Sequence, residues 1–93
     1  MGEAPKRAIF ITGGGSGIGR AIATYFGERG WFVGVTDIDQ QGMQETLDLI
    51  SGGFKYAHTL DVRDRAAWDT ALEAFSTAAG GRVDVVVNNA GIG

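Results

Sequence analysis

A dense run of glycines near the N-terminus limits the possible folds of this chain more than any other feature. Five of the 16 glycines lie between positions 13 and 19. They follow residues 8–12, an apolar run without in/out alternation, which is typical of a strand buried on both faces. Residues 18–29 then carry apolar side chains at helical spacing. The sequence therefore predicts a strand, a tight glycine turn and a helix, in that order.

Strand and helix signals keep alternating after this first unit. Further strands are predicted at 32–36, 54–60 and 83–88, and further helices at 40–51 and 64–79. The helix over 18–29 is expected to pack through Ile18, Ala21, Ile22, Tyr25 and Phe26. Strands that alternate with helices form a parallel sheet with right-handed crossovers. The predicted fold class is α/β, in one domain over residues 1–93 without repeats or linkers.

Composition excludes several functions. The formal net charge is −3 and the eight Lys and Arg residues are scattered, so no nucleic-acid partner is expected. No apolar run reaches the roughly 18 residues of a membrane span, and no signal peptide opens the chain, so we expect a cytoplasmic protein without a membrane partner. The chain has no cysteine and a single histidine, His58, which argues against thiolate catalysis and against a metal site.

The glycine loop has the properties that a nucleotide pyrophosphate requires. Its glycines let the backbone turn sharply and approach a phosphate without side chains in the way. The helix that follows presents unpaired N–H groups and a partial positive charge to the same place. No Gly-Lys-Ser/Thr occurs here, which excludes a Walker-type loop. A purely structural turn is the alternative to nucleotide binding.

Asp37 ends the second predicted strand, 18 residues beyond Gly19. A carboxylate there can accept hydrogen bonds from both ribose hydroxyls of an adenosine, and its charge would repel a 2′-phosphate. Ile38 and Asp39 follow it and Ser16 lies in the loop, so none of these supplies a cation for that phosphate. The pattern therefore predicts NAD rather than NADP. The alternative is that Asp37 or Asp39 only caps the next helix; Asp39 fits that role better and would leave Asp37 free.

Three motifs resemble the short-chain dehydrogenase/reductase family. They are Thr-Gly-x-x-x-Gly-x-Gly at Thr12, Gly13, Gly17 and Gly19, then Asp61-Val62, and finally Asn88-Asn89-Ala90-Gly91. The resemblance runs from Arg7 to Gly93. It implies the N-terminal half of a doubly wound Rossmann fold, with a parallel sheet in the order 3-2-1-4 and three helices. The first two helices would cover one face and the third the other, and the strand at 83–88 would have a bare edge.

The resemblance also implies a role for each matching residue. The loop residues Gly13, Gly15, Ser16, Gly17, Ile18 and Gly19 would wrap the pyrophosphate, and Asp37 would bind the adenine ribose. Asp61 by its side chain and Val62 by its backbone would contact the adenine ring. Asn89, Ala90 and Gly91 would lie beside the cofactor near its ribose, and Asn88 would tie neighbouring strands together. Alternatively, Asp61 or Asp64 caps the third helix, and Asn88-Asn89 is a plain turn. Arg63 departs from the family's usual Ser or Thr, a helix cap, so capping would fall to Asp64 or Asp61.

The family's catalytic Ser and Tyr-x-x-x-Lys have no counterpart in the 93 residues. The two tyrosines are Tyr25 and Tyr56, and the residues four positions later are Arg29 and Leu60. Both tyrosines lie in segments expected to pack. We therefore predict no catalytic residue here, and we expect these residues to be the N-terminal part of a longer chain.

The function that the resemblance implies is that of an NAD-dependent oxidoreductase. Such an enzyme moves a hydride between an alcohol or carbonyl substrate and the nicotinamide, and these residues would form its cofactor-binding half. The alternatives are a fragment that binds NAD or an adenine nucleotide without turnover, a truncated product without function, and a methyltransferase half-sheet. The loop of a methyltransferase usually follows an acidic residue, whereas Thr12 precedes this one. The complete protein is expected to act on a small molecule as a homodimer or homotetramer.

Overall fold

The computed structural model describes residues 7–52 and 54–90 of the chain. Its elements are β1 (Ala8–Thr12), α1 (Gly17–Glu28), β2 (Phe32–Asp37), α2 (Gln40–Asp48), β3 (Lys55–Thr59), α3 (Arg65–Ala78) and β4 (Val85–Asn88). The alternation of strands and helices follows the prediction. The second helix ends at Asp48 instead of residue 51. There the N–H groups of Leu49 and Ile50 bond three residues back, which tightens the last turn and stops the helix.

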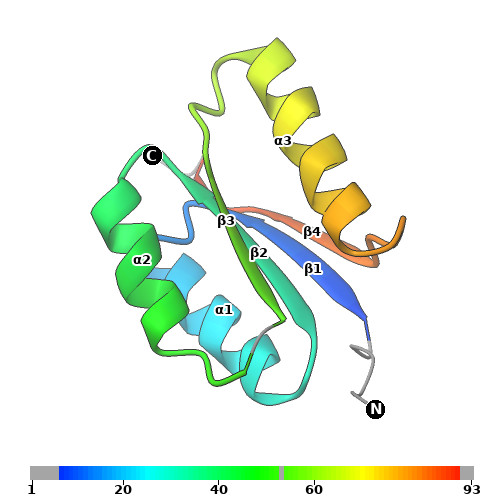
Figure 1. The fold of residues 1–93 in the computed structure, drawn as a ribbon. Coiled ribbons are helices and arrows are strands. Elements are labelled where there is room, and N and C mark those ends of the chain that lie inside the picture. The colour runs from blue at the N-terminus through cyan, green and yellow to red at the C-terminus, as the bar shows by residue number, and fades with distance from the viewer. Residues whose placement is uncertain (1–6, 53, 91–93) are drawn as a thin grey trace.

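The strands form one parallel sheet in the order β3-β2-β1-β4, as the resemblance implies (Figure 1). The register sets Thr12 at the end of β1 between Thr36 of β2 and Asn88 of β4. On the far side of β2, Asp37 pairs with Thr59 of β3. Parallel strands place their carboxyl ends at one edge of the sheet. The segments that follow β1, β2, β3 and β4 therefore meet there.

Two hydrophobic clusters fill the two faces of the sheet. On one face the sheet residues Ile9, Ile11, Val33 and Val35 pack with Ala23, Met43 and Ile50. On the other face Ala8 and Phe10 pack with Leu60, Ala71 and Phe75. Thus α1 and α2 cover one face and α3 covers the other, and Figure 1 shows the same two-sided arrangement.

The predicted packing side of α1 is partly wrong. Ile18 is 70% exposed and Tyr25 is 52% exposed, whereas the buried residues of the helix are Gly19 and Ala23. The two small residues let the helix backbone come close to the sheet, while Ile22 and Phe26 pack against the same core, as predicted. The Tyr25 ring instead stacks with Arg29, whose guanidinium carbon Cζ lies 3.5 Å from the ring centroid.

The edge of the sheet at β4 is open in the part of the chain that the structure describes. β4 pairs with β1 alone, and Val85 and Val86 are 38% and 45% exposed. The bare edge expected for this strand is therefore present in the described residues. No helix within residues 7–52 or 54–90 has the length and apolar character needed to cross a membrane.

Candidate functional site

The glycine loop between β1 and α1 needs its motif glycines for two different reasons. Gly13 and Gly17 have φ angles of +69° and +56°, a left-handed conformation that other residues rarely adopt. Gly19 instead lacks space, because a Cβ there would overlap the carbonyl group of Gly13 and approach the side-chain amide of Asn89. The loop conformation thus depends on backbone shape at two positions and on close contact at the third.

Thr12 joins the loop to the end of β4. Its hydroxyl oxygen accepts hydrogen bonds from the N–H groups of Asn89 (3.0 Å) and Ala90 (3.1 Å), and it lies 3.3 Å from the Asn88 amide oxygen, to which it can donate. The Asn89 side-chain amide donates to the carbonyl oxygen of Gly13 at 3.2 Å. The Asn88-Asn89-Ala90 segment is therefore held directly against the start of the glycine loop.

Asp37 also contacts the loop, which the sequence did not predict. Its Oδ2 accepts a hydrogen bond from the N–H of Gly15 (2.9 Å) and its Oδ1 accepts one from the N–H of Asp39 (3.1 Å). The predicted cap of α2 is confirmed, since Asp39 accepts a hydrogen bond from the N–H of Gly42 at 3.0 Å. A carboxylate offers about four acceptor sites, so the Asp37 side chain can still accept two further hydrogen bonds.

A cleft of about 870 Å³ opens at this edge of the sheet. Nine of the twelve predicted site residues line it: Gly13, Ser16, Gly17, Ile18, Asp37, Asp61, Val62, Asn89 and Ala90. Of the other three, Gly15 is buried in the loop, Gly19 is buried in the first turn of α1, and Gly91 lies outside the described residues. The lining residues that sequence reasoning missed are Ile38, Leu60 and Arg63. The volume falls within the range of small-molecule sites, roughly 300–1,000 Å³.

The N-terminus of α1 opens into the cleft. Ser16 is the N-cap residue in extended conformation, and its side chain makes no capping hydrogen bond. The first turn contains no acidic residue, and Gly17 and Ile18 line the cleft. The first N–H groups of a helix lack partners within the helix and carry a partial positive charge. This end of the cleft is therefore suited to an anion.

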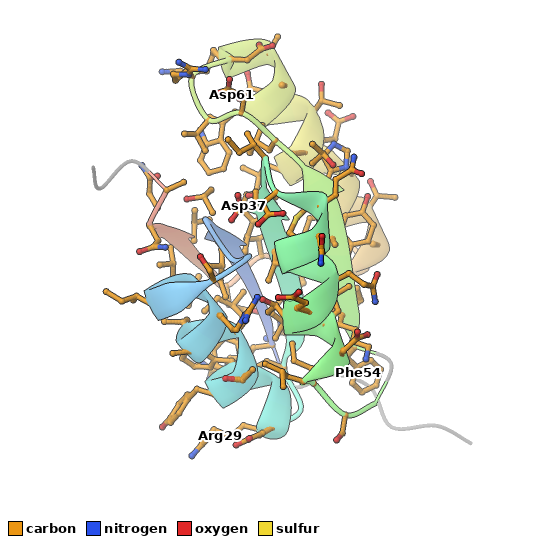
Figure 2. All side chains as sticks on the ribbon, turned by 90° about the vertical axis from the view of Figure 1, so that its left-hand side faces the viewer. Arg29, Asp37, Phe54 and Asp61 are labelled. Atoms are coloured by element: carbon orange, nitrogen blue, oxygen red, sulfur yellow. The ribbon has the colours of Figure 1, made fainter. Side chains whose placement is uncertain are left out.

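The lining also contains an ion pair between Asp61 and Arg63. The Arg63 guanidinium donates to both carboxylate oxygens, at 2.8 and 3.0 Å, and its backbone N–H donates to Oδ1 at 3.0 Å. Together these hydrogen bonds lower the pKa of Asp61 to about 2. The cap of α3 is Asp64, which accepts from the N–H of Ala67 at 3.1 Å, so Asp61 does not serve as the cap. Figure 2 shows Asp61 and Asp37 toward the same end of the sheet, opposite Arg29.

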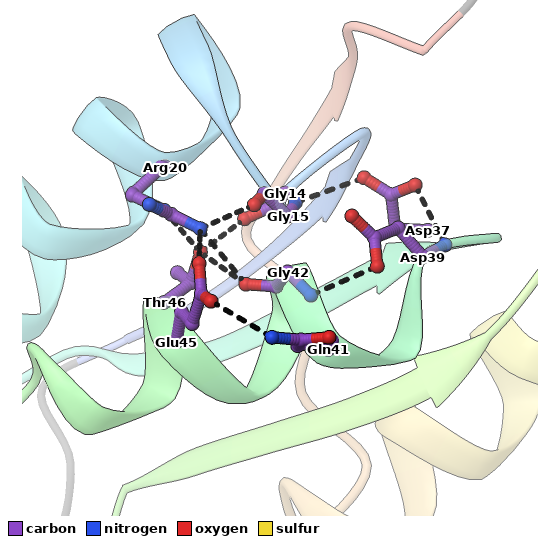
Figure 3. Close-up of polar contacts among 9 residues, drawn as sticks. All are labelled: Gly14, Gly15, Arg20, Asp37, Asp39, Gln41, Gly42, Glu45 and Thr46. Atoms are coloured by element: carbon purple, nitrogen blue, oxygen red, sulfur yellow. Dashed lines mark hydrogen bonds and ion pairs between the residues drawn. The ribbon is translucent and has the colours of Figure 1, made fainter.

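A further group of polar contacts lies behind the loop, on the side of α2 (Figure 3). Arg20 of α1 and Thr46 of α2 both bind carbonyl groups of the loop. Gly42 lets α2 approach, because a Cβ there would lie 2.6 Å from the Gly15 carbonyl oxygen. Sequence reasoning missed these contacts. A glycine inside a helical pattern was the one signal of close backbone approach.

Outside the cleft, the titratable groups of the described residues are not gathered into a metal centre. Within the described ranges, no three His, Asp or Glu residues lie close enough to hold a metal ion. Neither tyrosine lines the cleft. Tyr25 is on the outer side of α1, and Tyr56 of β3 is half-buried against Phe75, with 6.3 Å between ring centroids.

Comparison with known proteins agrees with this fold and motif set. A model of the short chain dehydrogenase family matches residues 7–93. The probable oxidoreductase EphD from Mycobacterium bovis is 42% identical over 87 residues, which cover 91% of this chain and 14% of that protein. The chain therefore belongs to the short chain dehydrogenase family.

Two solved structures illustrate the similarity in three dimensions. A 3-ketoacyl-(acyl-carrier-protein) reductase from Brucella melitensis, complexed with NADH, has a TM-score of 0.80 and 32% identity, covering 88% of this chain and 33% of that chain. A variant of actinorhodin polyketide ketoreductase with NADPH has a TM-score of 0.82 and 33% identity, covering 89% and 32%. The chain spans about a third or less of the length of the relatives it matches.

Proposed function

We propose that the cleft binds a nicotinamide dinucleotide, and that the protein is an oxidoreductase acting on an alcohol or carbonyl compound. One observation carries the proposal: the α1 N-terminus, Asp37, Asp61 and Asn89 line a single cleft at the carboxyl ends of parallel strands. Sheets of this kind bind their ligands at that edge. When bound, a nicotinamide cofactor supplies or accepts the hydride, and the protein binds and orients it. Residues 1–93 would be the cofactor-binding part of the domain.

The lining residues suit the successive parts of such a cofactor. The N–H groups at the start of α1 would bind the pyrophosphate, and the free acceptor sites of Asp37 would bind the adenine ribose. Asp61 and Val62 would contact the adenine ring. Asn89 and Ala90 would lie beside the ribose of the nicotinamide half. Gly15 and Gly19 do not line the cleft, and their role would be to let the loop adopt its shape.

NAD is the preferred cofactor in this proposal. The hydrogen bonds from Gly15 and Asp39 fix the Asp37 carboxylate at the cleft, so a 2′-phosphate on the ribose would meet a negative charge that cannot turn away. Arg63 is the cation among the described lining residues, and it is paired with Asp61. The solved relatives were complexed with NADH in one case and NADPH in the other, so this preference rests on the residues of this chain.

A second candidate is nucleotide binding without turnover. It is favoured by the α1 N-terminus and Asp37, which line the cleft and would bind a pyrophosphate and a ribose whether or not a hydride is transferred. The two candidates differ in one measurement. The natural full-length protein is mixed with NADH deuterated at C4 and a panel of small ketones. Deuterium on the carbinol carbon of a product supports the oxidoreductase, whereas NADH binding without any product supports the binding module.

The cofactor preference is tested by titrating NADH and NADPH into the natural protein and its Asp37→Ala variant. We expect the wild type to bind NADH more tightly and the variant to lose most of that preference. Because Asp37 also holds Gly15, the variant should bind both cofactors less well, so the ratio of the two affinities is the decisive quantity. Asp39→Ala is the matched control, since it removes a neighbouring carboxylate and the cap of α2 but should leave the ratio intact. An unchanged ratio in Asp37→Ala would overturn the assignment.

A further inference from the structure

We propose that Arg20 and Thr46 are positioning residues that hold the glycine loop in the conformation that binds the pyrophosphate. The proposal rests on the nucleotide-binding function proposed above. Neither residue lines the cleft, so neither is expected to touch the ligand. Their effect would pass through the carbonyl groups of Gly14 and Gly15.

Thr46 provides the first contact with the loop. Its side chain is fully buried, and its hydroxyl lies 2.7 Å from the carbonyl oxygen of Gly14. The carbonyl oxygen of Gly42, one turn earlier in α2, is farther away, at 3.2 Å. A hydroxyl has a single proton to donate, and the shorter distance favours the loop over the helix. The hydroxyl oxygen in turn accepts a hydrogen bond from Nε of Arg20 at 2.9 Å.

Arg20 provides the second contact. Its Nη2 donates to the carbonyl oxygen of Gly15 at 2.5 Å, and the carbonyl oxygen of Gly42 and Oε1 of Glu45 each lie 3.1 Å away. The guanidinium group therefore joins α1, the loop and α2 (Figure 3). Glu45 balances its charge, and the group lies outside the cleft, so it is not placed to bind a phosphate itself.

The contacts of Thr46 and Arg20 fix the orientation of two peptide groups in the loop. Both loop carbonyl oxygens are bound on the side of α2, and the N–H groups of the same residues, Gly14 and Gly15, are bound by the Thr36 carbonyl (3.0 Å) and by Asp37 (2.9 Å). A carbonyl oxygen that rotated into the cleft would repel a phosphate. Glycine peptides rotate more freely than others, so a glycine-rich loop needs such external contacts to stay in one conformation.

The test compares Thr46→Val with Thr46→Ser in the natural full-length protein. Valine has the shape of threonine but no hydroxyl, whereas serine keeps the hydroxyl and should rescue the function. Thr24→Val is the matched control, because the Thr24 hydroxyl bonds only to carbonyl groups within α1. Two readouts are used: the affinities for ADP and adenosine, and hydrogen exchange of residues 13–19 without ligand.

We expect Thr46→Val to bind ADP about tenfold more weakly, the factor that the loss of one well-formed hydrogen bond produces, with adenosine affinity nearly unchanged. Its loop amides should also exchange faster, and Thr46→Ser and Thr24→Val should resemble the wild type. Equal losses of affinity for ADP and for adenosine would point to a general loss of stability and would overturn the proposal. Unchanged hydrogen exchange of the loop in Thr46→Val would also overturn it.

A second pair of variants tests whether Arg20 and Thr46 act together. If both hold the same loop, combining Arg20→Met with Thr46→Val should weaken ADP binding little more than either change alone. Fully additive losses would contradict a shared role. If the wild type binds neither ADP nor NADH, the proposed function fails, and the exchange measurement still decides whether Arg20 and Thr46 hold the loop.

Discussion

The hydroxyl of Thr12 should stabilise the fold and the site far more than that of its neighbour in the sheet. Thr12 and Thr36 are paired directly across β1 and β2, and both are buried. The Thr12 oxygen accepts two backbone N–H groups, from Asn89 and Ala90. The Thr36 hydroxyl donates a single hydrogen bond of 3.3 Å, to the carbonyl oxygen of Ile11. Thr12→Val and Thr36→Val are therefore a matched pair with the same chemical change.

The size of the difference follows from which groups lose a partner. In Thr12→Val two N–H donors lose their acceptor, at about 1–3 kcal/mol each when buried. Because both donors are only partly buried, water can replace part of the loss, and about 2 kcal/mol in total is expected. In Thr36→Val one long hydrogen bond is lost, and a methyl group takes the place of the hydroxyl. That change should cost less than about 1 kcal/mol.

Urea unfolding of the two variants and the wild type measures these differences, and an NADH titration measures the effect on the site. Thr12→Val should lower the free energy of unfolding by about 2 kcal/mol and should weaken NADH binding, because Asn89 and Ala90 line the cleft. Thr36→Val should do neither. Equal destabilisation in the two variants would refute the role assigned to Thr12.

Further predictions concern the loop and the acidic pair. Gly19→Ala should weaken NADH binding by at least about tenfold, because its methyl group displaces the Gly13 carbonyl. The Cβ of Gly17→Ala meets open space, so this change should instead lower the free energy of unfolding by about 1–2 kcal/mol through left-handed strain; urea unfolding together with an NADH titration of both variants distinguishes the two causes. Arg63→Ser should return the pKa of Asp61 from about 2 toward 3.8, measured by carboxyl NMR. The depressed pKa implies a stabilising effect that is present above about pH 4 and is lost as the pH falls toward 2; Arg63→Ser should reduce this loss. An Asp61 titration that is the same in both proteins would contradict the ion pair.

The sequence predicted those features that depend on local chemistry. Every strand was predicted to within two residues at each end. β1 and β2 carry continuous apolar side chains because both of their faces are covered, whereas β3 was identified from its alternating pattern. Asp39 and Asp64 were identified as possible helix caps from type and position alone. The fold and the family membership are confirmed. The cytoplasmic location and the homodimer or homotetramer stay predictions.

Features that depend on contacts between distant segments were missed. The inner side of α1 was placed by apolar spacing, but the helix turns Gly19 and Ala23 inward because small residues allow a closer approach to the sheet. The contacts of Arg20 and Thr46 join positions 26 residues apart, and no local pattern distinguishes them from an ordinary exposed arginine and helical threonine. The bond between Asp37 and Gly15 was missed for the same reason.

That last bond restricts how the cofactor preference could evolve or be redesigned. Replacing Asp37 with an aliphatic residue removes a negative charge and, in the same step, the acceptor of the Gly15 N–H. A variant with a changed cofactor preference would therefore bind either cofactor more weakly, unless the new residue still accepts that hydrogen bond. Asparagine or serine at this position keeps an acceptor without the charge, so substitution to either residue opens a mutational route on which a cation for the 2′-phosphate can be added afterwards.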